Sequence, residues 1–398
     1  MPKNTRNYTE IEKQIDLEAF KDSVEGFFKE ITDPRTQDNQ KYPLSSLLVI
    51  MLMAIISGAN CILAIYDYAH AKHELIKIFL RMDDIPEYGV FWWLLTRMDP
   101  KEFASAFHKW TEDIRVKDLP DKAIHVDGKC LRGARNKKGN QNVHIVHAWS
   151  SKEGLLLGQL KTDEKSNEIT AIPELLEMID IKGATITIDA AGCQKKIIEK
   201  IHNGGAFYMV AVKENQPALY DECVKAFEAA HELDFYHVSN SDLAETVEKG
   251  HGRIESRKIA ICGNKFEFSE NITNSWKGLE TFIEVISERI VKGKKSIEKR
   301  YYISNAMKSA KKFGEGIRSH WSSENQLHWV LDVVFREDES RANTLHAAEN
   351  LATLRRMSLN YLNQAKETKL GTAQKRRRAG WDDTIVKQML VDIFVKKI

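Results

Sequence analysis

Two aspartates follow short apolar segments that are typical of β-strands, a position in which carboxylates often bind ligands. Asp127 follows the alternating apolar residues of IHVDGKCLRGA (residues 124–134), and Asp189 follows those of TITIDAAG (residues 185–192). Ligands bind at strand ends in sheets of this kind, and carboxylate oxygens are hard ligands that suit Mg²⁺ and Mn²⁺. Each aspartate alone could equally be a turn or capping residue, or one half of a structural salt bridge.

A third acidic candidate lies in IRSHWSSENQLHWVLDVVFREDESR (residues 317–341). If this segment is helical, His320, Glu324 and His328 lie along one ridge, because residues four apart share a face. A core helix with satisfied polar groups would also explain the pattern, and zinc is a weaker interpretation because no HExxH motif is present. Three carboxylates could hold two divalent ions about 4 Å apart, which activates the attacking oxygen and stabilises the leaving oxygen at a phosphodiester.

The same segment contains rival third ligands. Asp332 lies about two turns beyond Glu324, about 12 Å along a straight helix, so the two cannot share one small metal centre. The acids further along are Glu337, Asp338 and Glu339. Only one position can complete the site, and we expect it to be Glu324, because Trp321 and His328 flank it within one turn.

Basic residues gather near the first aspartate and recur later. Lys129, Arg132 and Arg135 follow Asp127 closely and could contact phosphates if the site acts on a polyanion. Alternate residues of HGRIESR (residues 251–257) share one strand face, which is either a basic face near DNA or a solvated face laced by ion pairs. The predicted DNA contacts are Lys129, Arg132, Arg135, Lys213, Asn215, Arg253, Arg257, Arg318 and His328.

The elements that must position these residues differ along the chain. Long apolar-periodic stretches without strand-like alternation predict an all-helical N-terminal domain over residues 1–117. Its apolar run LLVIMLMAII (residues 47–56) is too short to span a bilayer and predicts a buried core helix. Over residues 118–217, three successive strands and then helix, strand, helix and strand predict a mixed α/β sheet, the first part of a catalytic core.

The second half of the chain changes character twice more. Residues 218–305 contain one charged helix and several extended stretches, which predict a β-rich insertion. Residues 306–365 are expected to be helical and to complete the catalytic core. Residues 366–398 form a basic C-terminal tail carrying KRRRAGW (residues 375–381), a composition more typical of a solvated tail than of a DNA arm, followed by a short amphipathic helix.

Composition excludes some classes and leaves others open. The 59 lysines and arginines nearly balance the 57 aspartates and glutamates of the 398 residues, so net charge identifies no partner. The five cysteines are scattered and form no CxxC pair, which argues against a disulfide framework and a structural zinc site. The polar N-terminus does not resemble a signal peptide. We therefore expect a cytoplasmic, nucleoid-associated protein with no membrane partner.

Several stretches together resemble the H-repeat-associated group of bacterial insertion-sequence transposases, which are DDE enzymes with an RNase H-like core. They are DPR near residue 33, VDGKCLRGA, EKSNEI, TIDAAGCQ, VKENQP, HGRIESR and HWSSENQLHWVLDVVFREDESR. The resemblance implies that Asp127, Asp189 and Glu324 are the catalytic triad, with the β-rich insertion between the last two. Ala191 stands where the family usually has methionine.

The same resemblance implies a reaction and its partners. Water would first cut a DNA strand at the element end, and the resulting 3′-hydroxyl would then attack a phosphodiester in target DNA. The triad would hold two Mg²⁺ or Mn²⁺ ions, with no covalent protein intermediate. Pairing two ends of double-stranded DNA implies a homodimer. Two alternatives remain, a non-catalytic DNA-binding relative and a metal-dependent nuclease without strand transfer, and the intact carboxylates favour an enzyme.

Overall fold

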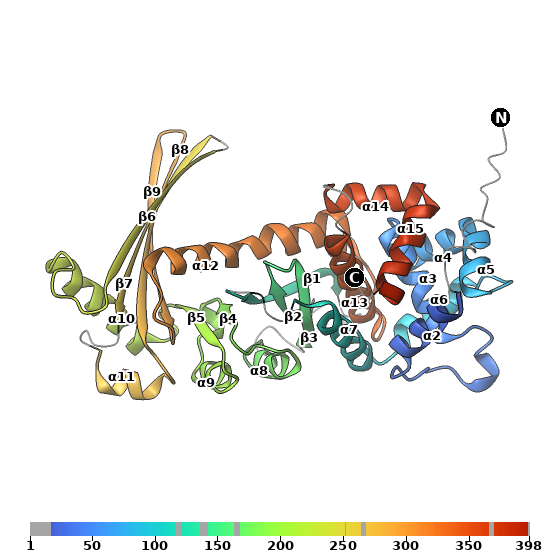
Figure 1. Cartoon of the computed structure of the whole chain (residues 1–398), viewed down its shortest axis with the longest axis horizontal. Coiled ribbons are helices and arrows are strands. Elements are labelled where there is room, and N and C mark those ends of the chain that lie inside the picture. Colours follow the sequence, from blue (N-terminus) through green and yellow to red (C-terminus); the bar gives the residue numbers. More distant parts are fainter. Residues whose placement is uncertain are drawn as a thin grey trace.

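A nine-stranded sheet with helices on both faces forms the centre of the molecule (Figure 1). The computed structural model describes residues 17–116, 119, 121–135, 142–162, 168–250, 252–263, 268–365 and 370–396. The strands are β1 (Ala123–Arg135), β2 (Asn142–Ser150), β3 (Leu155–Thr162), β4 (Thr185–Ile188), β5 (Phe207–Val212), β6 (Asp242–Gly250), β7 (Arg253–Gly263), β8 (Thr281–Val291) and β9 (Lys294–Ser304). Their order is β3-β2-β1-β4-β5-β9-β8-β7-β6.

The first five strands form the mixed part of the sheet. β1, β2 and β3 are antiparallel neighbours, whereas β4 and β5 run parallel to β1. The helices α8 (Glu168–Met178) and α9 (Lys195–Asn203) make the crossovers that parallel pairing requires. Both pack with α10 (Pro217–Glu232) against one face, over a core built from branched apolar residues of the strands. The predicted mixed α/β sheet is therefore confirmed.

The other four strands form a long antiparallel extension that projects from one end of the molecule (Figure 1). β9 pairs with β5, so this extension continues the central sheet. The short helix α11 (Glu270–Ser275) connects β7 to β8 at the base. The extended stretches expected within residues 218–305 are these strands, while the boundaries of that region as a domain stay a prediction.

Helices dominate the first described hundred residues. They are α2 (Leu17–Phe28), α3 (Leu44–Ile56), α4 (Ile62–Ala71), α5 (His73–Leu80), α6 (Tyr88–Arg97) and α7 (Pro100–Ile114). Every residue from 47 to 56 of α3 is buried, which confirms the expected core helix. The segment from residue 62 to residue 80 forms two helices, α4 and α5, because Lys72 has a non-helical backbone between them.

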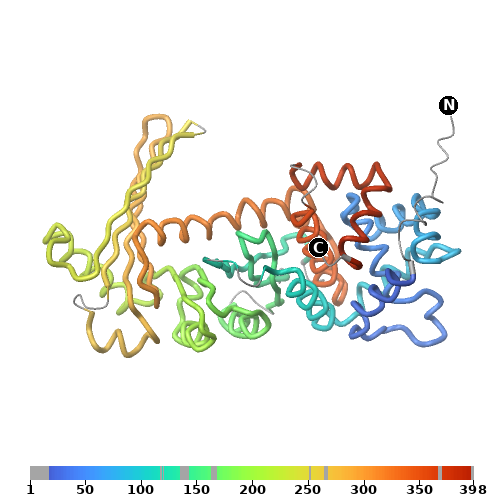
Figure 2. The backbone as a smooth tube through the Cα atoms, viewed as in Figure 1, coloured from blue at the N-terminus to red at the C-terminus, as the bar shows by residue number. Residues whose placement is uncertain are grey.

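The C-terminal segment differs from the expected solvated tail. It forms α14 (Thr372–Trp381) and α15 (Asp383–Val391), which pack with α13 (Ala347–Gln364) against the N-terminal helices (Figure 2). The guanidinium of Arg376 is buried and donates hydrogen bonds to the carbonyl oxygens of Ile55 and Ala59. Carbonyl groups at a helix end need donors from outside the helix, and this arginine supplies them at the end of α3.

One long helical rod crosses the second face of the sheet. It begins as α12 (Ala310–Ser323) beside the insertion and continues through two π-helical turns, Glu324–His328 and Val330–Val334, toward α13 (Figure 1). Apolar residues of α12 pack on the insertion strands at its start. None of the described helices combines the length and apolar character that crossing a membrane requires.

Candidate active site

The strand register brings the two aspartates side by side. Val126 of β1 is the parallel neighbour of Ile188 of β4, so the residues that follow them, Asp127 and Asp189, lie at the same edge of the sheet. Oδ1 of Asp189 accepts hydrogen bonds from the backbone N–H groups of Ala191 (3.1 Å) and Gly192 (3.3 Å). Asp189 is therefore also a capping residue, and both of its capping bonds use one carboxylate oxygen.

The helical rod carries Glu324 over this edge and is fixed to the sheet one turn earlier. The hydroxyl of Thr187 in β4 is hydrogen-bonded to Nδ1 of His320 in α12 (2.8 Å) and to Nδ1 of His125 in β1 (2.6 Å). This hydroxyl thus links the two rings, and the tautomer of each ring sets which group donates in each bond. Glu324 then begins the first π-helical turn, and such turns are frequent at functional sites.

These elements enclose a cavity of about 260 Å³. Its lining includes Asp127, Asp189 and Glu324, the three residues predicted to form the triad. One ligand atom each from Asp127, Glu324 and His328 lie within 4.8 Å of one another, a spacing that suits a metal ion. Asp189 lines the same cavity but lies outside that tightest cluster.

Burial and like charge shape the acidity of Asp127. Burial, together with the charges of Asp189, Glu324 and Glu168, raises the pKa of this carboxyl group to about 7, although a backbone hydrogen bond from Gly128 acts in the opposite direction. Among the described ion pairs, no lysine or arginine contacts any carboxylate of the triad. Carboxylates gathered in this way, without a protein cation, form a suitable site for a divalent ion.

A fourth carboxylate, that of Glu168, lies close to the site, next to Gly128, which has no side chain to block it. A Cβ atom at Gly128 would lie only 2.3 Å from Oε1 of Glu168, the first residue of α8, so the position next to Asp127 accepts no side chain without rearrangement. Sequence reasoning included Glu168 only within the EKSNEI stretch that carries the family resemblance. Nothing in its spacing indicated that α8 begins beside β1.

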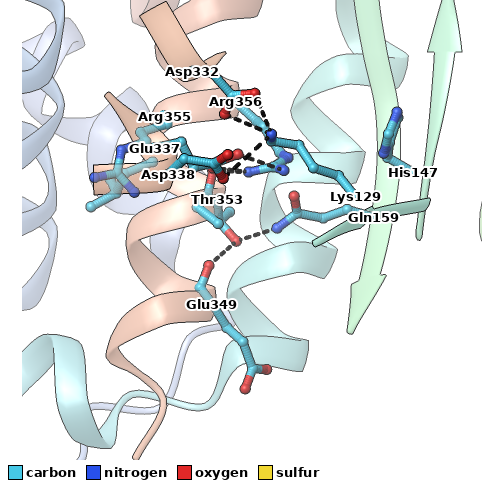
Figure 3. A network of polar contacts seen from close by, with 12 residues as sticks. Lys129, His147, Gln159, Asp332, Glu337, Asp338, Glu349, Thr353, Arg355 and Arg356 are labelled. Atoms are coloured by element: carbon cyan, nitrogen blue, oxygen red, sulfur yellow. Dashed lines mark hydrogen bonds and ion pairs between the residues drawn. The ribbon is translucent and has the colours of Figure 1, made fainter. Parts of the chain in front are cut away.

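The cations after Asp127 do not all reach the surface. Lys129 is only 6% exposed, and its Nζ lies 2.6 and 2.8 Å from the two carboxylate oxygens of Asp332 (Figure 3). The structure therefore places this predicted phosphate contact in a buried ion pair, because β1 continues beneath the helical rod. Arg132 is exposed and pairs at 3.5 Å with Asp338. The side chain of Arg135, the last residue of β1, lies outside the described part of the chain.

Glu337, one of the rival third ligands, is also paired with a cation of the protein. Its carboxylate pairs with Arg356 of α13 at 2.6 and 3.3 Å, and both side chains are fully buried (Figure 3). Burial alone would raise the pKa of Glu337, but the charges of Arg356 and Arg355 outweigh it and hold that pKa below its usual range. Glu339 forms an exposed pair with Arg336.

Two histidines meet behind the cavity. Nε2 of His328 lies 3.1 Å from Nε2 of His147 in β2, so one of these two nitrogens donates the shared proton. Burial lowers the pKa of His328 to about 4, helped by the charges of Lys129 and Arg356, and burial lowers that of His147 well below its usual value. Both rings are neutral near pH 7. His328, a predicted DNA contact, is only 9% exposed.

Two predicted contacts follow β5, close to the cavity. Lys213 is exposed and lines the cavity wall. The side-chain amide of Asn215 donates a hydrogen bond to the carbonyl oxygen of Ala190 (2.8 Å). Asn215 thus braces the turn that follows Asp189, while Lys213 has the freer access to a ligand.

The predicted contacts on the insertion lie on one face but are ion-paired. Arg253 and Arg257 in β7 flank Glu255 and pair with it at 2.9 and 2.6 Å. Arg318 of α12 pairs with Glu248 of β6. The face is therefore laced by ion pairs, and its approach to DNA stays a prediction. His251 of that stretch lies outside the described residues.

One cavity residue escaped sequence reasoning. Arg300 of β9 lines the cavity beside Trp321 of α12, the residue expected to flank Glu324, with the guanidinium 4.8 Å from the centre of the indole ring. Arg300 comes from the strand that returns from the insertion to pair with β5. Arg300 lies near the triad because β9 pairs with β5, and no local sequence pattern predicts that pairing.

Comparisons with known proteins agree with the geometry. A family model described as "Transposase DDE domain" matches residues 118–361, and a "DDE_Tnp_1-associated" model matches residues 26–111. The chain is 37% identical over 374 residues to "Putative transposase YncI" of Escherichia coli O157:H7, covering 92% of this chain and 94% of the relative. It is 38% identical over 366 residues to "H repeat-associated putative transposase YhhI" of Escherichia coli (strain K12), covering 90% and 95%.

A solved structure also aligns with most of the chain. It is the piggyBac transposase synaptic complex with hairpin DNA, which aligns at a TM-score of 0.39 and 11% identity over 94% of this chain and 80% of that one. The family model and the two relatives each cover well over half of the chain at levels that define a family. The chain therefore belongs to the family of bacterial DDE transposases that includes the H repeat-associated proteins.

Proposed function

We propose that this protein is a DNA transposase that cuts DNA at element ends and joins the resulting 3′-hydroxyl to target DNA. One observation carries the proposal: Asp127, Asp189 and Glu324 converge on one cavity, and among the residues that the structure describes no lysine or arginine is paired with them. Membership in the DDE transposase family supports DNA cleavage and joining as the reaction of this cluster. We further propose that β1 to β5 with the crossover helices and the helical rod form an RNase H-like core, in which the insertion separates Asp189 from Glu324.

The triad fits a pair of divalent ions. Asp127, Asp189 and Glu324 are the residues that would hold two Mg²⁺ or Mn²⁺ ions, since their oxygens are hard ligands and Asp127 lies close enough to the other two acids for their charges to raise its pKa. Such ions make an attacking oxygen more nucleophilic and stabilise the leaving oxygen. The chain's own contribution is to hold the acids in place, through the capping bonds of Asp189 and the His320–Thr187 bond of α12.

Cations beside the cavity support double-stranded DNA as the substrate. Lys213 and Arg300 line it directly, and Arg300 with Trp321 also borders a second hollow on the insertion that includes Arg257 and Arg289. Phosphate contacts from such side chains would position the backbone at the triad. Cutting two ends together calls for a homodimer, and a DNA substrate calls for a cytoplasmic, nucleoid-associated location.

Substitution of Glu324 by Gln tests the proposal. Gln keeps the size and hydrogen bonding of Glu but removes the charge that holds the ion, so cleavage and strand transfer should fall to background while DNA binding persists. The assay is end-sequencing of nicked and joined products from a plasmid that carries the gene with its native flanking DNA. Glu339→Gln, on the same segment but exposed and paired with Arg336, is the matched control and should stay active.

The same assay separates the alternatives. Mg²⁺ or Mn²⁺ should support cleavage, Ca²⁺ should support binding with little cleavage, and excess chelator should stop the reaction. Full activity in chelator, or an active Glu324→Gln variant, contradicts the proposed metal site. Cuts without joined products identify a nuclease, and DNA binding without any cut identifies a non-catalytic relative.

A further inference from the structure

His328 is the third donor in the cluster that unites Asp127 and Glu324. Its Nε2 lies 3.8 Å from Oδ2 of Asp127, and its Nδ1 lies 3.8 Å from Oε2 of Glu324. These two distances belong to different ring nitrogens, but one ligand atom from each of the three side chains lies within 4.8 Å of the other two. Ligand atoms around an octahedral ion with bonds of about 2.1 Å lie about 3 to 4.2 Å apart, so the three side chains are close enough together to share one ion.

Hydrogen bonds to Asp127 and Glu324 do not account for the position of the His328 ring. A separation of 3.8 Å is longer than a hydrogen bond, and the side chain is nine-tenths buried beside both acids. Within the described part of the chain, its hydrogen-bond partner is His147, through Nε2. Nδ1 has no partner there and points toward Glu324.

His147 has the properties expected of a residue that orients a metal-binding histidine. Metal-binding histidines almost always use their second ring nitrogen as a donor to a neighbour that fixes the ring. When Nε2–H of His328 donates to Nε2 of His147, the lone pair of His328 Nδ1 faces Glu324. His147 is fully buried in β2, where the surrounding side chains restrict the movement of its ring.

We propose that His328 is a nitrogen ligand of the divalent ion that Asp127 and Glu324 hold, with His147 as the positioning residue behind it. This inference rests on the proposed function, because it adds a ligand to the metal site of that function. With this nitrogen ligand, the two proposed metal positions differ in their ligands. The position held by Asp127 and Glu324 has one nitrogen ligand, whereas the position held by Asp127 and Asp189 has oxygen ligands alone. Imidazole is a better ligand for first-row transition ions than for Mg²⁺, so the Asp127–Glu324 position favours Mn²⁺.

Pulsed electron paramagnetic resonance of the full-length protein loaded with Mn²⁺ alone tests the ligand directly. Coordinated imidazole gives the bound ion a ¹⁴N modulation. We expect this signal in the parent protein and its loss in His328→Gln. The same substitution should weaken Mn²⁺ binding by at least about tenfold, since loss of even the partner behind a histidine ligand has that effect, and should narrow the preference for Mn²⁺ over Mg²⁺.

His320 provides the matched control, because it lies four residues before Glu324 as His328 lies four after it. It also borders the cavity, but its Nδ1 is already bonded to Thr187. His320→Gln should therefore keep the nitrogen signal. A signal that survives His328→Gln, disappears in His320→Gln or is absent from Mn²⁺-loaded parent protein overturns the assignment and leaves the proposed function standing. Failure of the parent to bind Mn²⁺ at all overturns both.

A variant of His147 tests the positioning role. His147→Leu should retain the ¹⁴N modulation, because the ligand itself remains, but should weaken Mn²⁺ affinity by about 10- to 100-fold. Thermal unfolding in chelator shows whether the variant is folded. An unchanged Mn²⁺ affinity in a folded His147→Leu variant contradicts the positioning role, and a lost nitrogen signal together with unchanged affinity contradicts the ligand assignment as well.

Discussion

Two acidic clusters both include residues of the segment 324–338 and differ in what balances their charge. The site cluster consists of Asp127, Asp189 and Glu324, and the described lysines and arginines form no ion pair with it. The internal cluster consists of Asp332, Glu337 and Asp338, which are paired respectively with Lys129, Arg356 and Arg132. From sequence alone, Glu324, Asp332, Glu337 and Asp338 all look like acids of one polar helical segment.

The difference separates structural acids from ligand-binding acids. In the internal cluster, arginine charge holds the pKa of Glu337 below its usual range despite full burial. In the site cluster, burial raises the pKa of Asp127 to about 7. A poorly solvated charge without a partner destabilises the fold, so within the site cluster the largely buried Asp127 is stabilised by a cation from solution. The internal cluster brings its own cations and instead fastens the helical rod to β1 and α13.

The largest effect should follow removal of a cation from the internal cluster. Arg356→Met leaves the carboxylate of Glu337 buried without its bidentate partner, and loss of one member of a buried pair costs about 3–5 kcal/mol. The melting temperature should fall strongly and should recover little at high salt, because the pair is shielded from solvent. Adding Glu337→Leu should restore most of the loss, since an apolar replacement of both partners is often neutral. If Arg356→Met lowers the melting temperature only slightly, Glu337 does not depend on this arginine and belongs with the metal ligands instead.

A smaller effect of opposite sign, a gain in stability, is expected when Asp127 of the site cluster is replaced by Asn. The folded-state pKa of Asp127 is raised from 3.8 to about 7, so its contribution to stability is present below pH 3.8 and is lost as pH rises through about 7. Asp127→Asn removes that loss. A shift of this size corresponds to about 4 kcal/mol, and partial exposure of the carboxylate reduces the expected gain to about 2 kcal/mol.

The pH dependence is the check on this second prediction. In chelator, the melting temperature of Asp127→Asn should exceed that of the parent at pH 8, and the difference should shrink toward pH 5. Mn²⁺ should stabilise the parent but not the variant. A variant that melts below the parent at pH 8 in chelator would mean that Asp127 is held by a cation of the protein, which removes the distinction between the two clusters.

Much of the fold follows from local pattern. Apolar runs and their periods predict α3 and the sequence of strands and helices from β1 to β5, because each element there buries a continuous face. The break at Lys72 and the packing of α14 escape prediction, because both depend on contacts with distant parts of the chain. Arg376 belongs to a basic run by composition, and only the carbonyl groups at the end of α3 make it a buried residue.

The candidate site was predictable to the extent that strand register can be inferred. The two aspartates at strand ends could be expected to meet, because parallel neighbours finish at one edge. The role of Lys129 could not be inferred, since its proximity to Asp127 in sequence is compatible with phosphate and with Asp332 alike. Arg300 and His147 reach the site through pairing between strands, which leaves no signature in residue spacing.

The smallest effect should separate two cations that lie three residues apart in β1. The side chain of Arg132 is 80% exposed and its pair with Asp338 is long at 3.5 Å, so Arg132→Ala should change stability by no more than about 0.5 kcal/mol. As a phosphate contact it should lower the slope of DNA affinity against salt by about one unit. Lys129→Ala should leave that slope unchanged and instead lower the melting temperature, because Asp332 loses its buried partner. Binding isotherms at several salt concentrations, with melting curves of both variants, measure the two effects together. If Lys129→Ala lowers the slope in a protein of unchanged stability, Lys129 faces DNA, and the internal cluster is an extension of the DNA-binding surface.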